Sequence, residues 1–176
     1  DYSKNLLPYS KIMKIVDCFM YSDEDMLLDV RLNILDKYVS NFIICEASFN
    51  HNGSSKNLNF NINNFLKFKD KITYLTIDKQ PNNLCKILEN DVDDKKNSKI
   101  LDNALNRENY QRNFISKGLD KFSDEDLIII NDLDEIPNLE NFKYKNKITF
   151  FKQKMFYYKF NLTYPNFIWM GSKACK

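Results

Sequence analysis

Hydrophobic residues along the chain form short runs that predict an alternation of strands and helices. Four runs are apolar and rich in β-branched residues, a pattern typical of strands that are buried in a parallel or mixed sheet. They occupy Lys14–Met20, Phe42–Cys45, Ile72–Ile77 and Leu127–Asn131. The first two are separated by one helical segment, which predicts a right-handed βαβ unit.

Three segments have the spacing of helices. After Tyr21, Ser22 or Asp23 can cap a helix that extends through Tyr38. Ile62–Lys71 predicts a short helix, and Ile100–Phe122 has the longest helical pattern. In the first helix the apolar positions at helical spacing are Met26, Leu27, Val30, Ile34, Leu35 and Tyr38.

The remaining segments are polar loops and a C-terminal pair of strands. Phe49–Asn61 predicts a loop, and Asp78–Lys99 predicts a long surface loop with one helical turn. Ile148–Phe151 and Met155–Asn161 are aromatic-rich and predict two strands suited to form a hairpin. The expected fold is therefore α/β: one domain over residues 12–176, with a mostly parallel sheet flanked by helices, after an irregular lead-in at residues 1–11.

The longest helix places polar groups on its predicted core face. With 100° per residue, an apolar arc also contains Glu108, Gln111 and Arg112. Glu108 and Arg112 can form an internal i,i+4 ion pair. Alternatively this end of the helix faces a polar cleft, where Arg112 meets a phosphate, Asp17 or Asp132. The apolar members of the arc are Leu101, Ala104, Leu105, Ile115 and Leu119.

A carboxylate cluster follows the last of the four buried runs. Asp132, Asp134 and Glu135 precede Pro137, which stops any regular element. In an extended chain Asp132 and Asp134 point to the same side, where their repulsion is relieved by a cation. Oxygen ligands with open positions suit magnesium or manganese that carries a phosphate. A solvated acidic turn after a buried strand would show the same pattern.

Composition narrows the possible functions only modestly. The 176 residues contain 26 basic and 24 acidic side chains, and the absence of a basic stripe disfavours a nucleic-acid partner. No apolar run approaches the roughly 20 residues that a membrane span needs. Four cysteines without a C-x-x-C pair favour a reducing compartment over a disulfide framework.

Five spaced motifs together resemble glycosyltransferase family 17. Its best-known members, β-1,4-mannosyl-glycoprotein 4-β-N-acetylglucosaminyltransferases, add bisecting N-acetylglucosamine to N-glycans. The resemblance implies a GT-A fold and inverting transfer from a UDP-sugar to a glycan acceptor with manganese or magnesium. The motifs are Val16–Phe19, Arg31–Asn33, Ile44–Ala47, Arg107–Asn113 and Asp132–Pro137.

The resemblance also implies roles for particular residues. Asp132 and Asp134 would hold the metal and, with the metal, the diphosphate. Further donor contacts would come from Asp17, Glu46, Gln111 and Arg112.

Two more site residues are predicted from their position in the chain. Glu135 is the base candidate nearest the acidic motif, although it could equally hold a backbone amide or orient Arg112. Trp169 precedes Gly171, which permits close backbone approach at a turn, so we expect this ring at the acceptor or donor-sugar edge of a cleft.

One departure from the family leaves alternatives open. The family domain continues past a Trp-x-Gly segment, which predicts a domain truncated at its C-terminus and a non-catalytic nucleotide- or glycan-binding module as the alternative. A phosphatase of the haloacid dehalogenase type also has D-x-D after an apolar strand, but its motif lies near the chain start and continues with Gly-Thr. If the protein is microbial, we expect it in the cytoplasm. If it is eukaryotic, we expect it in the Golgi lumen, held by an anchor that lies outside this chain.

Overall fold

The computed structural model describes residues 13–159 and 161–176. The predicted lead-in at residues 1–11 lies outside this range. The strands are β1 (Ile15–Met20), β2 (Asn41–Ala47), β3 (Ile72–Ile77), β4 (Leu127–Asn131), β5 (Ile148–Phe156) and β6 (Thr163–Cys175). The α-helices are α1 (Asp25–Leu35) and α2 (Asp93–Phe114), and the 3₁₀ segments are η1 (Ile62–Lys71) and η2 (Ile115–Gly118).

The described strands form one six-stranded sheet in the order β3-β2-β1-β4-β6-β5. β1 to β4 are parallel, whereas β6 is antiparallel to both β4 and β5. The chain leaves β1 toward β2 and β3 and then returns to place β4 on the other side of β1. This reversal makes the carboxyl ends of β1 and β4 a topological switch point, where open α/β sheets leave a crevice. The predicted α/β class and the parallel pairing of the four buried runs are confirmed.

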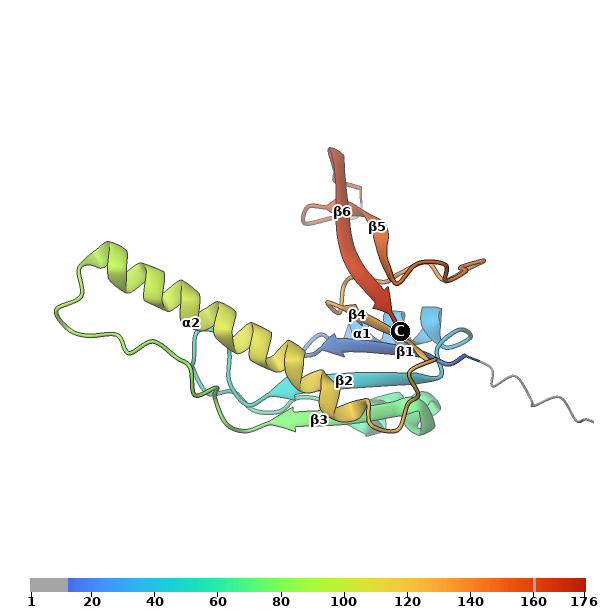
Figure 1. Ribbon diagram of the computed structural model, residues 1–176, viewed down its shortest axis with the longest axis horizontal. Helices are drawn as coiled ribbons and strands as arrows, with labels where there is room; N and C mark the ends of the chain where they lie inside the picture. Colours follow the sequence, from blue (N-terminus) through green and yellow to red (C-terminus); the bar gives the residue numbers. More distant parts are fainter. Residues whose placement is uncertain (1–12, 160) are drawn as a thin grey trace, which may run out of the picture.

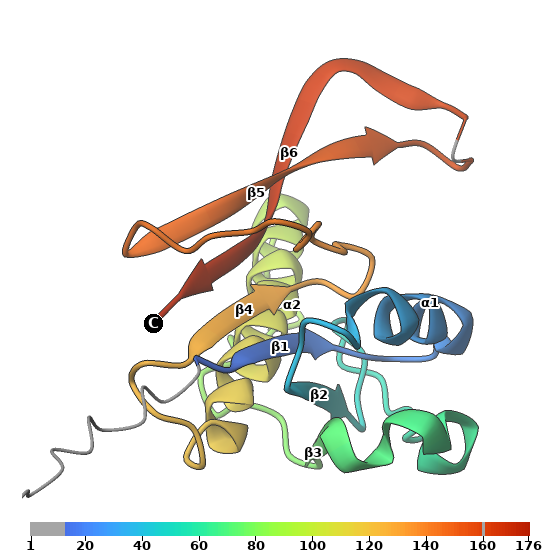
Figure 2. The same ribbon diagram turned by 90° about the vertical axis from the view of Figure 1, so that its right-hand side faces the viewer.

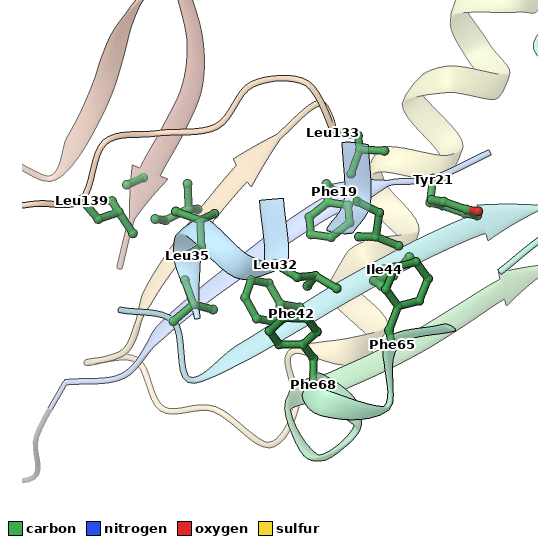
Figure 3. Packing of buried hydrophobic residues seen from close by; sticks show 14 of the residues in the cluster. Phe19, Tyr21, Leu32, Leu35, Phe42, Ile44, Phe65, Phe68, Leu133 and Leu139 are labelled. Carbon is green, nitrogen blue, oxygen red and sulfur yellow. The ribbon is translucent and has the colours of Figure 1, made fainter. Parts of the chain in front are cut away.

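Helical segments cover both faces of the parallel strands (Figures 1 and 2). On one face, α1 and η1 pack on Phe19, Phe42 and Ile44, and Figure 3 shows this cluster with Phe65 and Phe68 of η1. On the other face, Ile115 of η2 and flanking aromatic residues pack on the remaining side chains of β1 and β2. The core is therefore a three-layer arrangement in which both faces of the parallel strands are buried.

The predicted first helix exists, but its buried face differs from the expected one. Met26 is 84% exposed and Val30 and Ile34 are also exposed, whereas α1 buries Leu28, Arg31, Leu32 and Leu35. Neither Ser22 nor Asp23 caps the helix. Instead, the Glu24 carboxylate accepts hydrogen bonds from the backbone N–H groups of both residues. The expected face was therefore only partly right. Leu35 is buried and Leu27 and Tyr38 pack against the core, as expected. Met26, Val30 and Ile34 are displaced to solvent because Arg31 occupies the centre of the buried face.

The longest helix begins earlier than predicted and buries a polar stripe. α2 starts at Asp93, inside the segment expected to be a loop. Leu101 is 70% exposed and Leu105 is 54% exposed. The buried residues of α2 are Asn103, Arg107 and Gln111, which repeat every four residues along one face. The apolar arc was the wrong face over most of the helix, although Ile115 beyond its end is buried as expected.

The C-terminal strands form a longer hairpin than predicted. A single strand, β5, spans Ile148–Phe156, and its partner β6 contains the segment 167–171. Of the second strand expected at Met155–Asn161, Met155 and Phe156 belong to β5, whereas residues 157–159 and 161 lie outside any strand, so that expectation was wrong beyond Phe156. The paired strands form a ribbon that projects from the sheet beyond β4 (Figure 2).

Candidate active site

The predicted acidic cluster lies at the switch point, in a turn that directly follows β4. The backbone turns at Leu133 and Asp134 instead of remaining extended, and the Glu135 N–H donates to the Asp132 carbonyl at 3.0 Å. Asp132 and Asp134 nevertheless line the same cavity. Asp132 and Asp134 therefore lie together as predicted, but a turn brings them together and not an extended backbone. We refer to residues 132–135 as the carboxylate turn.

A buried arginine holds the carboxylate turn in place. Arg31 Nη1 donates to the backbone carbonyls of Asp132, Leu133 and Glu135 at 3.2, 3.0 and 3.0 Å. The same guanidinium binds both carboxylate oxygens of Asp17, at 2.8 Å from Nε and 2.7 Å from Nη2. Both side chains of this pair are fully buried. One guanidinium thus joins α1 to β1 and holds the carbonyls of three of the four residues in the turn.

Asp17 and Glu46, both predicted to contact a donor, lie beneath the site. Besides Arg31, the Asp17 carboxylate accepts a 2.5 Å hydrogen bond from Asn131 Nδ2. The fully buried Glu46 carboxylate accepts from Lys56 Nζ and from the backbone N–H groups of Asn59 and Phe60. Neither Asp17 nor Glu46 lines the three cavities described below. In this structure they support the turn and the loop after β2.

Unlike Asp17 and Glu46, Asp132 and Asp134 reach solvent. Asp134 is exposed, and its carboxylate forms no hydrogen bond or ion pair with the described residues. Asp132 Oδ1 accepts from Arg112 Nη2 at 3.0 Å, and the same nitrogen contacts Glu108 Oε1 at 3.0 Å. Two of the partners predicted for Arg112, the i,i+4 glutamate and Asp132, are therefore present together, whereas the third, Asp17, pairs with Arg31 instead. Burial opposes the charged form of Arg112, but Asp132 and Glu108 together raise its pKa.

A cavity of about 620 Å³ opens at the carboxyl ends of β1, β2 and β4. One wall is the segment after β1, a second is the loop after β2 with His51 and Lys56, and α2 contributes a third. The carboxylate turn closes the remaining side. Its lining residues are Met20, Tyr21, Ser22, Glu24, Leu27, Phe49, Asn50, His51, Lys56, Glu108, Gln111, Asp132, Leu133 and Asp134.

The polar stripe of α2 ties the loops around this cavity to the helix. Gln111 Nε2 donates to the Cys45 carbonyl at 2.9 Å, and Arg107 Nη1 donates to the His51 carbonyl at 3.1 Å. Gly53, at φ +93°, lies so close to the Arg107 guanidinium that a Cβ atom there would collide with it. Asn103 binds both the N–H and the carbonyl of Cys85. The predicted donor residue Gln111 therefore lines the cavity while its amide is anchored to β2.

On the other side of the turn, Glu135 connects the acidic cluster to the ribbon. Its Oε2 accepts from the backbone N–H of Asp132 at 3.1 Å, and its Oε1 accepts from Trp169 Nε1 at 2.5 Å. Glu135 thus makes the backbone contact that the sequence left open as one of its roles. Gly171 lies against the Glu135 carboxylate, where an added Cβ would collide with it. Trp169 is 42% exposed and lines two further cavities, of about 700 and 770 Å³, that also contain Asp132 and Glu135.

The free carboxylate oxygens of Asp132 and Asp134 suit a divalent cation that also binds phosphate. Asp134 offers two free carboxylate oxygens and Asp132 one. Among the described residues, no three His, Cys, Asp or Glu side chains are grouped so that they could hold a metal ion alone. Magnesium is usually held by one or two carboxylates together with substrate phosphates, so two aspartates fit this binding mode.

Comparison with protein-family models identifies the family. The model of glycosyltransferase family 17 matches residues 5–173, nearly the whole chain. The chain belongs to glycosyltransferase family 17. The resemblance inferred from the five motifs is confirmed, and the family assignment supports a transferase that uses nucleotide-sugar and glycan partners. No curated protein and no solved structure gave a significant match. In the described part of this family 17 chain, no helix is long and apolar enough to cross a membrane.

Several residues of the site were missed from the sequence of this family 17 member. Arg31 was quoted within a motif but given no role, and Arg107, Lys56 and His51 received none. A signal for Arg31 was present, because Asp17 sits inside an apolar strand and a buried carboxylate needs a partner. Helical spacing alone could not choose that partner, since buried positions are ordinarily expected to be apolar.

Proposed function

We propose that this chain transfers a sugar from a UDP-sugar to a glycan acceptor at the carboxylate turn. The observation that carries this proposal is the position of Asp132 and Asp134. They line a cavity at the topological switch point, on a turn held by three hydrogen bonds from Arg31. With its parallel strands covered on both faces, the sheet is consistent with the GT-A fold of the family.

In this proposal the first cavity receives the nucleotide diphosphate. Asp134, with Asp132, would hold manganese or magnesium, which supplies Lewis-acid stabilisation of the departing diphosphate. Arg112 lies at the border of this cavity, where it binds Asp132 and Glu108, and would contact a phosphate by exchanging one of these two carboxylates for it. Lys56, which lines the first cavity, adds a second cation. N-acetylglucosamine is the donor sugar that the family suggests.

The transfer itself would proceed with inversion. The acceptor oxygen forms a bond to the anomeric carbon as the bond from that carbon to the phosphate oxygen breaks, and UDP leaves with the electron pair. The acceptor hydroxyl proton passes to a carboxylate, which must lie within hydrogen-bond reach. Glu135 is our candidate for this base, because it is joined to Trp169 at the edge where we place the acceptor. N-glycan or polysaccharide synthesis is the process that such a reaction would serve.

Asp134→Ala tests the metal and diphosphate site. We expect it to remove manganese-dependent UDP binding, because it deletes the carboxylate that is free to ligate the cation. Stability should change by less than about 0.5 kcal/mol, as for other exposed side chains. Calorimetric titration of UDP with and without manganese measures the first effect, and urea unfolding measures the second.

Asp102→Ala is the matched control, since Asp102 is also an exposed aspartate but lies on α2 outside the three cavities. Unchanged UDP affinity in Asp134→Ala would contradict the metal assignment. A turnover assay with a panel of UDP-sugars separates the transferase from a non-catalytic binding module, which would bind UDP without consuming any donor.

A further inference from the structure

A row of aromatic side chains runs along the ribbon toward the carboxylate turn. Neighbouring ring centroids are 5.5 Å apart for Tyr157 and Tyr164, 5.6 Å for Tyr164 and Phe167, and 6.4 Å for Phe167 and Trp169. We call these four residues the aromatic row. Three of them lie in β6 and Tyr157 directly follows β5, in the part of the molecule that projects from the sheet in Figure 2.

A local change in the backbone places these rings on one side of the ribbon. In a regular strand, residues three apart point to opposite faces. Asn166 lies in the left-handed region at φ 61°, and the pairing of β5 with β6 shifts register nearby. The pairs Lys154–Ile168 and Phe156–Thr163 are two residues apart on β5 but five apart on β6, and an irregularity of this kind re-aims the side chains that follow it. Tyr164 and Phe167 therefore lie on the same face of the ribbon. Trp169, two residues after Phe167, lies on this face as well.

All four rings retain substantial solvent exposure, between 42% and 46%. A contiguous apolar patch that is exposed to this extent often marks a binding site. Tyr158, which is 99% exposed, contacts Tyr157 at the outer end of the row, and Lys152 and Lys154 line the third cavity together with Trp169 at the inner end. A narrow apolar track with polar borders suits an elongated amphipathic ligand better than a flat apolar surface.

The row ends at the site that we assign to sugar transfer. Trp169 donates to Glu135, and it lines a cavity together with Asp132 and Asp134. A ligand lying along the row would therefore present one end to the carboxylate turn. The spacing between neighbouring rings is of the order of the length of one sugar unit, and the C–H face of a pyranose packs well on an aromatic ring.

We propose that the aromatic row binds an extended oligosaccharide, the non-reacting part of the acceptor, with successive sugars packed on successive rings. That the bound oligosaccharide is the acceptor rests on the proposed function. That the ligand is an oligosaccharide rests on the aromatic row alone. Affinity should then rise with the number of sugars until the row is filled. Trp169 is the only tryptophan of the chain, so its fluorescence reports directly on occupancy at the inner end.

The test is a fluorescence titration of the full chain with β-1,4-linked N-acetylglucosamine and mannose oligosaccharides, from the monosaccharide to the pentasaccharide. We expect affinity to increase with length in at least one series. Tyr164→Ala and Phe167→Ala should each weaken binding of the longest ligand about tenfold, the loss expected for one stacked ring. Ile168→Ala is the matched control, because Ile168 is an exposed apolar residue between Phe167 and Trp169 that alternates to the opposite face.

UDP binding with manganese is measured on the same variants and should not change, because the row lies outside the first cavity. Row-dependent oligosaccharide binding without any UDP binding would overturn the proposed transferase and leave the row intact. Normal UDP binding without length-dependent oligosaccharide binding would overturn the row alone. Two further outcomes would overturn the oligosaccharide site. One is that the row variants instead abolish binding to vesicles of equal phosphatidylcholine and phosphatidylglycerol. The other is that they convert a dimer into a monomer in sedimentation.

Discussion

At the scale of single residues, the Arg31 guanidinium has the largest structural role in the site. It forms five hydrogen bonds, two to Asp17 and three to backbone carbonyls of the carboxylate turn. Its Cζ atom also lies 4.7 Å from the centroid of the Phe19 ring. A fully buried ion pair contributes little net stability, yet removing one partner leaves a charge without compensation. The pair therefore fixes the geometry of the turn more than it stabilises the fold.

Arg31→Met should lower the free energy of unfolding by about 3–5 kcal/mol, because Asp17 and three carbonyls lose their donor. Urea unfolding of the purified chain measures this loss. The double variant Asp17→Leu with Arg31→Met removes both charges and should recover part of it, which also keeps the test informative if the single variant does not fold. A loss below about 1 kcal/mol in the single variant would contradict the assigned role.

At the scale of elements, α2 departs from the usual design of a surface helix. Its buried stripe consists of Asn103, Arg107 and Gln111, each of which binds a group in the segments after β2 and β3 or at the end of β2. The N-terminal half of the helix extends past the strands (Figure 1), so there it contacts loops more than the sheet. Polar side chains suit this task, because loop backbone groups need hydrogen-bond partners.

Asn103→Ala should therefore destabilise the protein by about 1–3 kcal/mol, since it leaves the N–H and the carbonyl of Cys85 without their partner. Leu105→Ala on the same helix should cost less than about 0.5 kcal/mol, because this leucine is exposed. The comparison is made by urea unfolding of both variants. The reverse order of the two losses would show that the helix buries its apolar arc after all.

At the scale of the whole molecule, several ionisable groups are buried or partly buried in their neutral forms. Burial, with Asp17 as the second cause, raises the pKa of the Cys18 thiol, and burial raises that of Cys45 to about 12. Tyr21 and Tyr74 also have raised pKa values, first from desolvation and then from hydrogen bonds to Asp25 and Glu46. All four groups hold their protons more tightly in the folded chain than in the unfolded one.

The sign of the pH dependence follows from these shifts. Above the ordinary values of 9.0 for cysteine and 10.0 for tyrosine, the unfolded state releases protons that the folded state retains. Stability is thus fully present below about pH 9 and should fall as pH rises beyond it. Urea unfolding between pH 8 and 11 measures the slope, and Tyr74→Phe should make it shallower above pH 10. A stability that rises over this interval would contradict the prediction.

The local elements of this protein were determined largely by its sequence. β-Branched apolar runs specified the four parallel strands, and β3 has the predicted bounds, Ile72–Ile77. The order of the motifs also specified the family, which the match over residues 5–173 confirms. Such features depend on short stretches of chain, where side-chain period and composition already restrict the backbone.

Tertiary structure alone decided which faces are buried and which charges meet. Arg31 is 14 residues from Asp17 and more than 100 from the carbonyls that it binds, so helical spacing could not pair them. The buried stripe of α2 and the backbone turn at Asp134 likewise depend on partners supplied by other segments. Apolar periodicity locates a helix on the assumption that its buried face is apolar. That assumption fails where the buried face must bind backbone groups and carboxylates.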